Sequence, residues 1–311
     1  MDRHPLARAY AALAAVCFFW GTTYLGIRMA LESFEPVRLV AFRFVVSGVL
    51  MAAFLRWRGL APPRGRELLW TAVNGLLILG VGNLCLTLSE QRIPSSLAAL
   101  FVSISPFWFV AIEALVPGGE RPSPRALAGM ALGFFGAGLL FVPNLLDRGF
   151  HGHVWQGFLI LQAGGISWSL GSVLQKRYPS RAHPFSGAAA QQLAVGLAYL
   201  GPALIHGPRP EEWSARGTGA MIYLIVFGSI VGYSAYIYAL EKLPVSLVSV
   251  YTYVNPVVAA ILGALIYGEP FGWRELCAMA VIFSGVAAVK SATPPSQSPS
   301  PPAPHRSLAG R

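Results

Sequence analysis

Few residues of this chain could do chemistry inside an apolar environment, and Arg43 is the foremost. It is the one basic residue well inside an apolar segment. A charge at that depth normally faces the interior of a helical bundle and is a functional candidate by default. Its guanidinium could bind an anionic group of a substrate or satisfy helix carbonyls, and a structural role is the simpler interpretation. The acids cluster at segment ends and in loops, and Glu113 is the exception, although it sits within about a turn of the inner interface. At 1.5 Å per residue it differs from Arg43 in depth by roughly 17 Å, so no ion pair between them is expected.

Aromatic residues away from the segment ends form a second group of candidates. Trp20, Trp108 and Trp168 lie near the middle of apolar segments, and Tyr24 and Ser172 follow Trp20 and Trp168 by one helical turn on the same face. Aromatic and hydroxyl groups in this arrangement form the walls of cavities for organic ligands, whereas simple packing between helices is the competing interpretation. The other five tryptophans lie at segment ends, as in an interfacial aromatic belt: Trp57, Trp70, Trp155, Trp213 and Trp273.

Further polar residues complete the predicted substrate-binding set. The middle parts of other segments contain side chains that could contact a ligand or hydrogen-bond between helices. The full predicted set is Trp20, Tyr24, Asn83, Trp108, Trp168, Ser172, Tyr233 and Tyr253.

Two prolines interrupt apolar segments. Pro106 and Pro256 each remove one backbone hydrogen bond and free a carbonyl, those of Val102 and Thr252 respectively. Helix kinks that shape a central cavity are expected at both prolines, although a kink needed only for packing would leave the same pattern.

The signatures of several other kinds of chemistry are absent from the sequence. The two aspartates, Asp2 and Asp147, lie in loops, which excludes an intramembrane aspartyl dyad. There is no HExxH motif and no phosphate-binding GxxxxGK[ST] loop. His151 and His153 form an HxH pair without neighbouring carboxylates or cysteines, and the three cysteines form no CxxC motif. We therefore expect no metal, no cofactor and no catalytic residues.

The composition explains why these residues must work inside a membrane. The chain has 311 residues, of which 55% are apolar and 12% charged, half of the roughly 25% that is usual in soluble domains. The mean hydropathy is +0.56. A net charge of +10 without basic runs interleaved with aromatics is typical of cytoplasmic loops facing anionic lipid, and no nucleic-acid partner is expected.

Apolar segments of about 20 residues, the length needed to cross a bilayer, recur along the chain. They predict an all-α integral membrane protein with ten transmembrane helices. We place them near residues 8–31, 36–56, 67–89, 95–116, 124–143, 154–175, 184–206, 217–240, 245–268 and 272–290.

The distribution of Lys and Arg predicts the orientation. With the N-terminus inside, basic residues in the inner segments outnumber those in the outer ones by about two to one, so both termini are expected in the cytoplasm. The first segment is interpreted as an uncleaved span of a multi-pass protein of the inner, or plasma, membrane. Residues 291–311 form a tail rich in Pro and Ser, which is expected to be disordered and cytoplasmic.

An internal repeat orders the segments. The second half of the chain matches the first at an offset of 148–150 residues. Matched pairs include Trp20 with Trp168, Pro36 with Pro184, Gly82 with Gly232, Pro106 with Pro256, and Gly136 with Gly285. Residues 8–143 and 154–290 each hold five segments, and because five is odd the second copy inserts upside down. Inverted repeats of this kind are typical of secondary transporters with a midplane binding site between the halves.

Several phrases of the sequence resemble a known family. They are Phe19-Trp-Gly-Thr-Thr-Tyr, Phe42-Arg-Phe, Pro94, Pro106 and Gly119-Glu120-Arg121, with Pro244, Asn255-Pro256, Gly268-Glu269-Pro270 and Trp273-Arg-Glu-Leu in the second half. The chain resembles the EamA-type ten-span permeases of the drug/metabolite transporter superfamily over residues 8–290. This resemblance implies transport of small metabolites, amino acids or drugs, frequently outward. Gln191 departs from the pattern, since an arginine is expected opposite Arg43.

A secondary transporter with alternating access is therefore the function predicted from the sequence. It would move small metabolites, amino acids or related compounds, and in some cases drugs, outward across the membrane. A non-saturable channel or a lipid scramblase is the alternative, and an intramembrane enzyme is the weaker one because no catalytic constellation occurs. The expected partners are a small-molecule substrate and the lipid bilayer, while the sequence leaves open a monomer or a homodimer.

Overall fold

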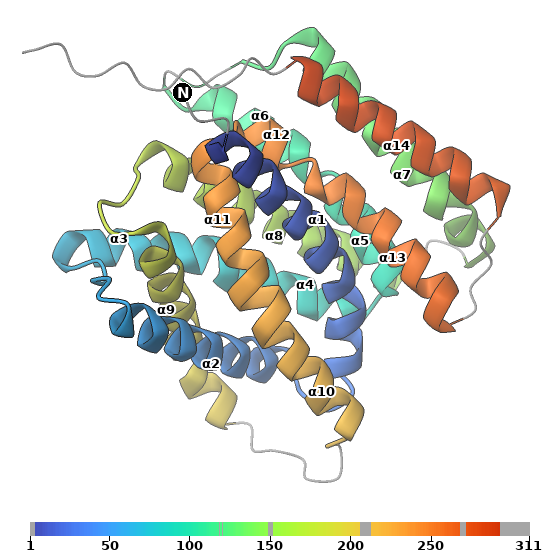
Figure 1. Cartoon of the computed structure of the whole chain (residues 1–311). Coiled ribbons are helices and arrows are strands. Elements are labelled where there is room, and N and C mark those ends of the chain that lie inside the picture. The colour runs from blue at the N-terminus through green and yellow to red at the C-terminus, as the bar shows by residue number, and fades with distance from the viewer. Residues whose placement is uncertain are drawn as a thin grey trace, which may run out of the picture.

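The computed structural model describes residues 4–117, 119, 121–148, 152–205, 213–267 and 272–292, and within these residues every regular element is a helix (Figure 1). The first half contains α1 (His4–Ala30), α2 (Pro36–Trp57), α3 (Gly65–Gly75), η1 (Leu76–Val81), α4 (Gly82–Glu90), α5 (Ser95–Val102), α6 (Ser105–Leu115) and α7 (Pro124–Arg148). The second half contains α8 (Gly152–Arg177), α9 (Pro184–Ile205), α10 (Ala215–Tyr223), η3 (Leu224–Val231), α11 (Gly232–Lys242), α12 (Val245–Val248), α13 (Tyr251–Tyr267) and α14 (Trp273–Ala292). Residues 291 and 292 of the predicted disordered tail belong to α14, and the rest of the tail, from residue 293 onward, lies outside the described residues.

The number of membrane-crossing segments agrees with an integral membrane protein. Eight helical segments among the described residues are long and apolar enough to cross a bilayer. The apolar part of α14, Leu276–Ala292, is shorter. In Figure 1, α14 lies alongside α7, so these two helices are the remaining candidates of each half. The all-helical membrane fold is confirmed, while the count of ten stays a prediction that depends on this pair.

Proline and glycine fix where the helices begin and how closely they approach. Pro36 and Pro184 open α2 and α9, where a missing N–H costs nothing. A Cβ atom added to Gly48 of α2 would stand 2.8 Å from the backbone nitrogen of Leu193 in α9. These two helices therefore pack with their backbones close together, as helices with small interfacial residues do in membranes. Gly129 plays the same part between α7 and α14.

Equivalent helices of the two halves make equivalent contacts with the opposite half. Helix α1 packs against α13 and against α10, η3 and α11 of the second half. Helix α8, its counterpart, packs against α5 and α6 and against α3, η1 and α4 of the first half. Helices α2 and α9, also counterparts, pack on each other. The two inverted repeats thus interlock around α1 and α8 rather than forming two separate domains.

Contacts at the helix termini define two ends of the bundle. At the end where α1 begins, the ammonium group of Lys290 lies 4.8 Å from the ring centre of Tyr10, which places the end of α14 beside the start of α1. We call this the proximal end. At the end where α1 stops, the hydroxyls of Ser33 and Ser214 lie 3.1 Å apart, which places the start of α10 there. We call this the distal end.

The surface and the core of the bundle have the composition expected in lipid. The five tryptophans assigned to the aromatic belt are all more than half exposed: Trp57, Trp70, Trp155, Trp213 and Trp273. Large apolar side chains such as Phe54 and Leu197 are exposed along the helices, where lipid would cover them. The largest fully buried side chains are instead tyrosines: Tyr233, Tyr236 and Tyr253. The polar groups of the protein are therefore concentrated inside the bundle.

Candidate substrate cavity

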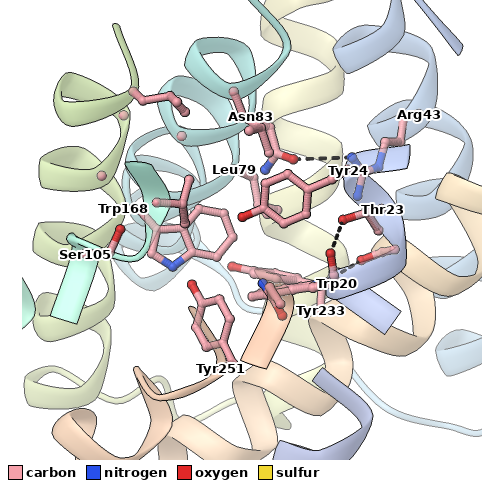
Figure 2. A pocket seen from close by; sticks show the side chains of 18 of the residues that line it. Trp20, Thr23, Tyr24, Arg43, Leu79, Asn83, Ser105, Trp168, Tyr233 and Tyr251 are labelled. Carbon is pink, nitrogen blue, oxygen red and sulfur yellow. Dashed lines mark hydrogen bonds between the residues drawn. The ribbon is translucent and has the colours of Figure 1, made fainter. Parts of the chain in front are cut away.

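A cavity lies at the centre of the bundle, between the two repeats. It encloses about 720 Å³ of empty space, part of which is open to the surroundings. Figure 2 shows side chains from both halves of the chain pointing into it. Its walls are formed by Trp20, Thr23, Tyr24, Arg43, Phe44, Leu79, Gly82, Asn83, Leu86, Val102, Ser105, Leu161, Gly164, Gly165, Trp168, Gly228, Tyr233, Tyr251 and Asn255. Largely apolar walls with a few polar groups are typical of small-molecule sites.

An aromatic layer lies on the proximal side of the cavity. The ring centres of Trp20 and Trp168, the matched tryptophans of the two repeats, lie 5.3 Å apart with the rings at 85°. Tyr236 and Tyr251 lie 5.0 and 5.1 Å from Trp20, so four rings from four helical segments pack together. The indole N–H of Trp20 donates to the carbonyl of Gly228 at 3.0 Å, and that of Trp168 donates to the Tyr236 hydroxyl at 3.2 Å. Because both N–H groups already have acceptors, the tryptophans offer ring surface rather than polar edges to a ligand.

Arg43 forms a charged edge on another side of the cavity. Its side chain is 4% exposed, its Nε donates to the Ser229 hydroxyl at 2.7 Å, and its Nη1 donates to Oδ1 of Asn83 at 3.3 Å (Figure 2). The lining residues include no Asp or Glu. In the described part of the chain, no carboxylate forms an ion pair with Arg43. The cavity therefore carries one buried positive charge.

The second repeat contains the same contact without the charge. Gln191 corresponds to Arg43 at the offset of 148, and Tyr233 corresponds to Asn83 at the offset of 150. The hydroxyl of Tyr233 donates to Oε1 of Gln191 at 2.7 Å. The amide nitrogen of Gln191 donates to Gln175 at 2.7 Å, so this side chain is fully engaged among neutral groups. The replacement noted in the sequence thus makes an otherwise symmetric cavity electrostatically one-sided.

Breaks in the regular α-helices border the cavity in both repeats. The π-helical segments η1 and η3 occupy equivalent places, and each contributes one lining residue, Leu79 and Gly228 respectively. A π-helical turn widens the helix locally, and such turns are frequent at functional sites. In addition, α5 and α6 are separated at 103–104 and α12 and α13 at 249–250, and the residues that follow, Ser105 and Tyr251, line the cavity.

The two prolines have unequal positions in their helices, and the expected kinks at both stay a prediction. Pro106 is the second residue of α6, because the helix already breaks two residues earlier, whereas Pro256 lies inside α13. Neither proline lines the cavity. The carbonyl of Thr252 that Pro256 leaves without its helical partner accepts a hydrogen bond from Ser103 at 3.1 Å. The break in the first repeat thus supplies the hydroxyl that satisfies the interrupted helix of the second.

Five of the eight residues predicted to bind substrate line the cavity: Trp20, Tyr24, Asn83, Trp168 and Tyr233. Ser172 lies just behind this wall. Its hydroxyl is 2.6 Å from that of Tyr236, which accepts a hydrogen bond from the Trp168 indole N–H, so Ser172 supports the aromatic layer without lining the cavity.

The structure places Trp108 and Tyr253 elsewhere. The indole N–H of Trp108 donates to Gln162 at 2.9 Å and so joins α6 to α8 outside the cavity walls. The ring of Tyr253 is fully buried and faces Gly133 of α7, where an added Cβ would stand 3.1 Å from it. Its hydroxyl has no hydrogen-bond partner among the described residues. Both side chains therefore pack between helices, which was the competing interpretation for Trp108, whereas an interhelical hydrogen bond was the alternative for Tyr253.

Sequence reasoning did not include several wall residues in the predicted set. Thr23 and Tyr251 were omitted although Thr23 lies between Trp20 and Tyr24 in the chain, one residue before a predicted wall residue. Gly82 was matched only as a repeat position. An added Cβ there would stand 2.7 Å from the Trp168 ring, so the glycine makes room for that ring. Paired glycines in an inverted repeat were the signal that could have pointed to this close approach.

A second cavity, of about 930 Å³, lies at the proximal end and holds the other intramembrane charge. Its polar lining residues are Glu113, Arg121, Ser123, Lys176, Arg177 and Ser246. Arg43 and Glu113 therefore line different cavities, and no hydrogen bond or ion pair between them occurs in the described structure, as expected. No group of three or more His, Cys, Asp or Glu in the described residues is placed to hold a metal ion, and His151 of the HxH pair lies outside them.

Comparison with known proteins assigns this architecture to a family. The EamA-like transporter family matches the chain twice, over residues 7–142 and 155–290. The uncharacterized inner membrane transporter YedA of Escherichia coli is 36% identical over 291 residues, which covers 93% of this chain and 92% of that protein. A probable terminal-alkyne amino-acid exporter of Streptantibioticus cattleyicolor is 26% identical over 266 residues, covering 85% and 87% of the two chains.

A solved crystal structure shares the fold. It superposes with a TM-score of 0.76 at 21% sequence identity and covers 92% of this chain and 97% of its own. Two family matches, one in each half of the chain, coincide with the two interlocked repeats around the cavity. The chain is therefore a multi-pass membrane protein that belongs to the EamA-like transporter family.

Proposed function

We propose that this protein is a secondary transporter that moves small organic metabolites, such as amino acids or related compounds, out of the cytoplasm by alternating access. The observation that carries the proposal is the central cavity, which both inverted repeats build around the matched pair Trp20 and Trp168. A site on the axis between inverted halves can be exposed to either side by rocking one half against the other.

The contacts around the cavity support a state in which one side of the cavity is closed. At the proximal end, the ammonium group of Lys176 in α8 donates to the carbonyl of Leu243, between α11 and α12. The equivalent residues at the distal end are Arg28 and Ile93, and no hydrogen bond joins these two. The proximal side also holds the aromatic layer. This asymmetry is expected of a transporter in a state with one side closed. In alternating access, each repeat adopts in one state the contacts that its counterpart makes in the other state.

The orientation and the direction of transport belong to the same proposal. The excess of Lys and Arg at the proximal end supports a cytoplasmic location of that end in an inner-membrane protein, in line with the inner membrane location in the name of YedA. Outward transport is supported by the exporter among the relatives. Reporter fusions at Pro63 and Ser180 are expected to read cytoplasmic, and fusions at Gly149 and Glu211 periplasmic.

Flux into proteoliposomes tests transport itself. A transporter gives initial rates that saturate with substrate concentration, and a preloaded substrate accelerates uptake by exchange. A channel would give rates that rise linearly with concentration, and a scramblase would move lipid rather than solute. Metabolite profiles of cells with and without the gene supply the candidate substrates, and their export should fall when the gene is deleted.

Cross-linking tests alternating access. Cysteines are introduced at Lys176 and Leu243 at the proximal end, or at Arg28 and Ile93 at the distal end, in a chain whose native cysteines are replaced by alanine. A short bifunctional thiol reagent should join the proximal pair in the resting protein and stop transport. The distal pair should react more slowly in the resting protein and faster when substrate is turning over. Equal and substrate-independent reaction of both pairs would contradict the mechanism.

A further inference from the structure

The cavity carries information about the class of substrate, and this inference rests on the proposed function. We propose that the transported molecules are organic monoanions, that Arg43 binds their carboxylate group, and that the aromatic layer receives their apolar body.

The first argument is the charge balance of the cavity. Arg43 is 4% exposed, and no carboxylate pairs with it in the described structure. Its hydrogen-bond partners, Ser229 and Asn83, are both neutral. A buried charge without a counter-charge is unfavourable in a low-dielectric environment. An anionic ligand would remove this penalty on binding, whereas a cationic ligand would add to it.

The second argument is the set of hydrogen-bond donors that remain. A guanidinium has five N–H donors, and the known contacts use one on Nε and one on Nη1. No hydrogen bond within the described residues uses Nη2. An added Cβ at Gly228 would stand 2.8 Å from Nη2, so the guanidinium packs directly against this glycine, which has no side chain to displace it. Arg43 is thus positioned by two contacts and retains donors for a ligand.

The neighbouring groups extend this donor set. Because Oδ1 of Asn83 accepts from Arg43, the amide nitrogen of Asn83 is left to donate, and Figure 2 shows it on the side away from Arg43. The Tyr24 side chain lies close to it in the same view. A carboxylate has acceptor sites for several donors at once, and a guanidinium binds it bidentately. A phosphate carrying two charges would fit less well, since the lining residues supply only one positive charge.

The opposite wall has a different character. Trp168, Ser105 and Tyr251 lie across the cavity from Arg43 in Figure 2. The Trp168 indole N–H is already bonded to Tyr236, so its ring face is the surface that a ligand meets. A molecule with a carboxylate at one end and an apolar or aromatic body at the other matches both walls. The carboxylate of an amino acid could bind Arg43 in the same way, but its ammonium group would have no carboxylate partner in the cavity walls.

The experiment compares molecules that differ only in charge. The probes are 3-phenylpropionate, its neutral amide and 3-phenylpropylamine, together with the same three forms built on propionate and on indole-3-propionate. Binding to the purified protein is measured by quenching of tryptophan fluorescence, and flux is measured in proteoliposomes. We expect at least one carboxylate to bind more than tenfold more tightly than its amide and its amine.

Variants at Arg43 locate the selectivity. Arg43→Gln should reduce carboxylate binding at least tenfold and bring the acid and the amide to similar affinities. Arg43→Lys keeps the charge and should retain part of the preference. The glutamine is sterically plausible, since Gln191 fills the equivalent position of the second repeat. Arg38→Gln is the matched control: Arg38 is also buried in α2, but it donates to the carbonyl of Ala203 at 3.4 Å and does not line the cavity. It should change carboxylate binding less than twofold.

The outcomes separate this inference from the proposed function. Saturable transport of amides or amines as efficient as that of the acids would overturn the inference and leave the transporter intact. A preference for acids that survives Arg43→Gln would overturn it as well, and so would absence of binding by every carboxylate in the panel. Carboxylate binding that depends on Arg43, without flux of any probe, would support the inference and count against transport.

Discussion

Nη1 of Arg43 donates to Oδ1 of Asn83 at 3.3 Å, and this contact joins α2 to α4 beside the central cavity. The equivalent contact of the second repeat joins Gln191 to Tyr233 at 2.7 Å. The inverted repeats thus preserve a hydrogen bond while changing its chemistry from charged to neutral. Two halves with nearly the same fold can in this way form a cavity with only one charged side.

The pairing of Arg43 with Asn83 predicts that Asn83→Asp disables anion binding without unfolding the protein. Aspartate has the shape of asparagine, and its carboxylate would pair with the guanidinium and occupy the donors that a ligand needs. Carboxylate binding should fall at least tenfold, while the unfolding temperature in detergent should not drop. Asn83→Ala is the comparison, because it removes the acceptor and keeps the positive charge free for ligand. Wild-type affinity for carboxylates in Asn83→Asp would contradict the prediction.

The edge-to-face pair of Trp20 and Trp168 predicts a graded loss of transport. Trp168→Ala removes a cavity wall and should lower the initial flux at least tenfold, and Trp168→Phe, which keeps an aromatic face, should lose less. Trp108→Phe is the control, since Trp108 bonds Gln162 outside the cavity and should leave flux within twofold of the wild type. Flux is compared at equal amounts of protein with the same melting behaviour. Undiminished transport by the combined Trp20→Ala and Trp168→Ala variant would mean that these rings only pack.

The bond between Ser103 and the carbonyl of Thr252 predicts a non-additive pair of substitutions. Interhelical hydrogen bonds of this kind in membrane proteins average about 0.6 kcal/mol, so Ser103→Ala should lower the free energy of unfolding by up to about 1 kcal/mol. Pro256→Ala restores a backbone N–H that can bond to Thr252 within the helix. In that background Ser103→Ala should cost less. Equal costs of Ser103→Ala in both backgrounds, measured by unfolding in mixed detergent, would show that the contact contributes nothing.

The absence of Asp and Glu from the cavity walls predicts that flux does not require a pH gradient. Substrate flux into proteoliposomes should be similar with and without an imposed gradient. Two acids serve as checks. Glu113 lines the proximal cavity. Glu90, at the distal end of α4, is 7% exposed, and neither carboxyl oxygen has a hydrogen-bond partner in the described structure. Flux that stops without the gradient and is lost in Glu90→Gln or Glu113→Gln would assign proton coupling to that residue.

The sequence by itself determined the class of fold. The apolar segments follow from the requirement that a chain in lipid satisfies its own backbone, so their length and spacing predict helices without any knowledge of packing. The positions of Pro36 and Pro184 predicted where α2 and α9 begin. The inverted repeat could also be recognised in the sequence. The spacing between Trp20 and Trp168, or between Gly82 and Gly232, does not depend on the tertiary contacts.

Only some of the residues of the site could be predicted from the sequence. Trp20, Tyr24, Asn83, Trp168 and Tyr233 were predicted from their depth and their polar or aromatic character, and they line the cavity. Trp108 and Tyr253 have the same character and depth, yet they face Gln162 and Gly133 between helices. Depth in a span is a property of the sequence, whereas the direction of a side chain depends on how each helix is rotated against its neighbours.

The tertiary structure alone decided how the helices break and where the charge of Arg43 points. The widened turns η1 and η3 contain no proline, and the carbonyl of Thr252 that Pro256 frees accepts a hydrogen bond from Ser103, which is 149 positions away. The same is true of Arg43: its depth in α2 could be predicted from the sequence, but Ser229 and Asn83, on two other helical segments, determine its direction. Side chains that meet only when distant helices pack cannot be paired from local pattern, because their energies depend on the whole bundle.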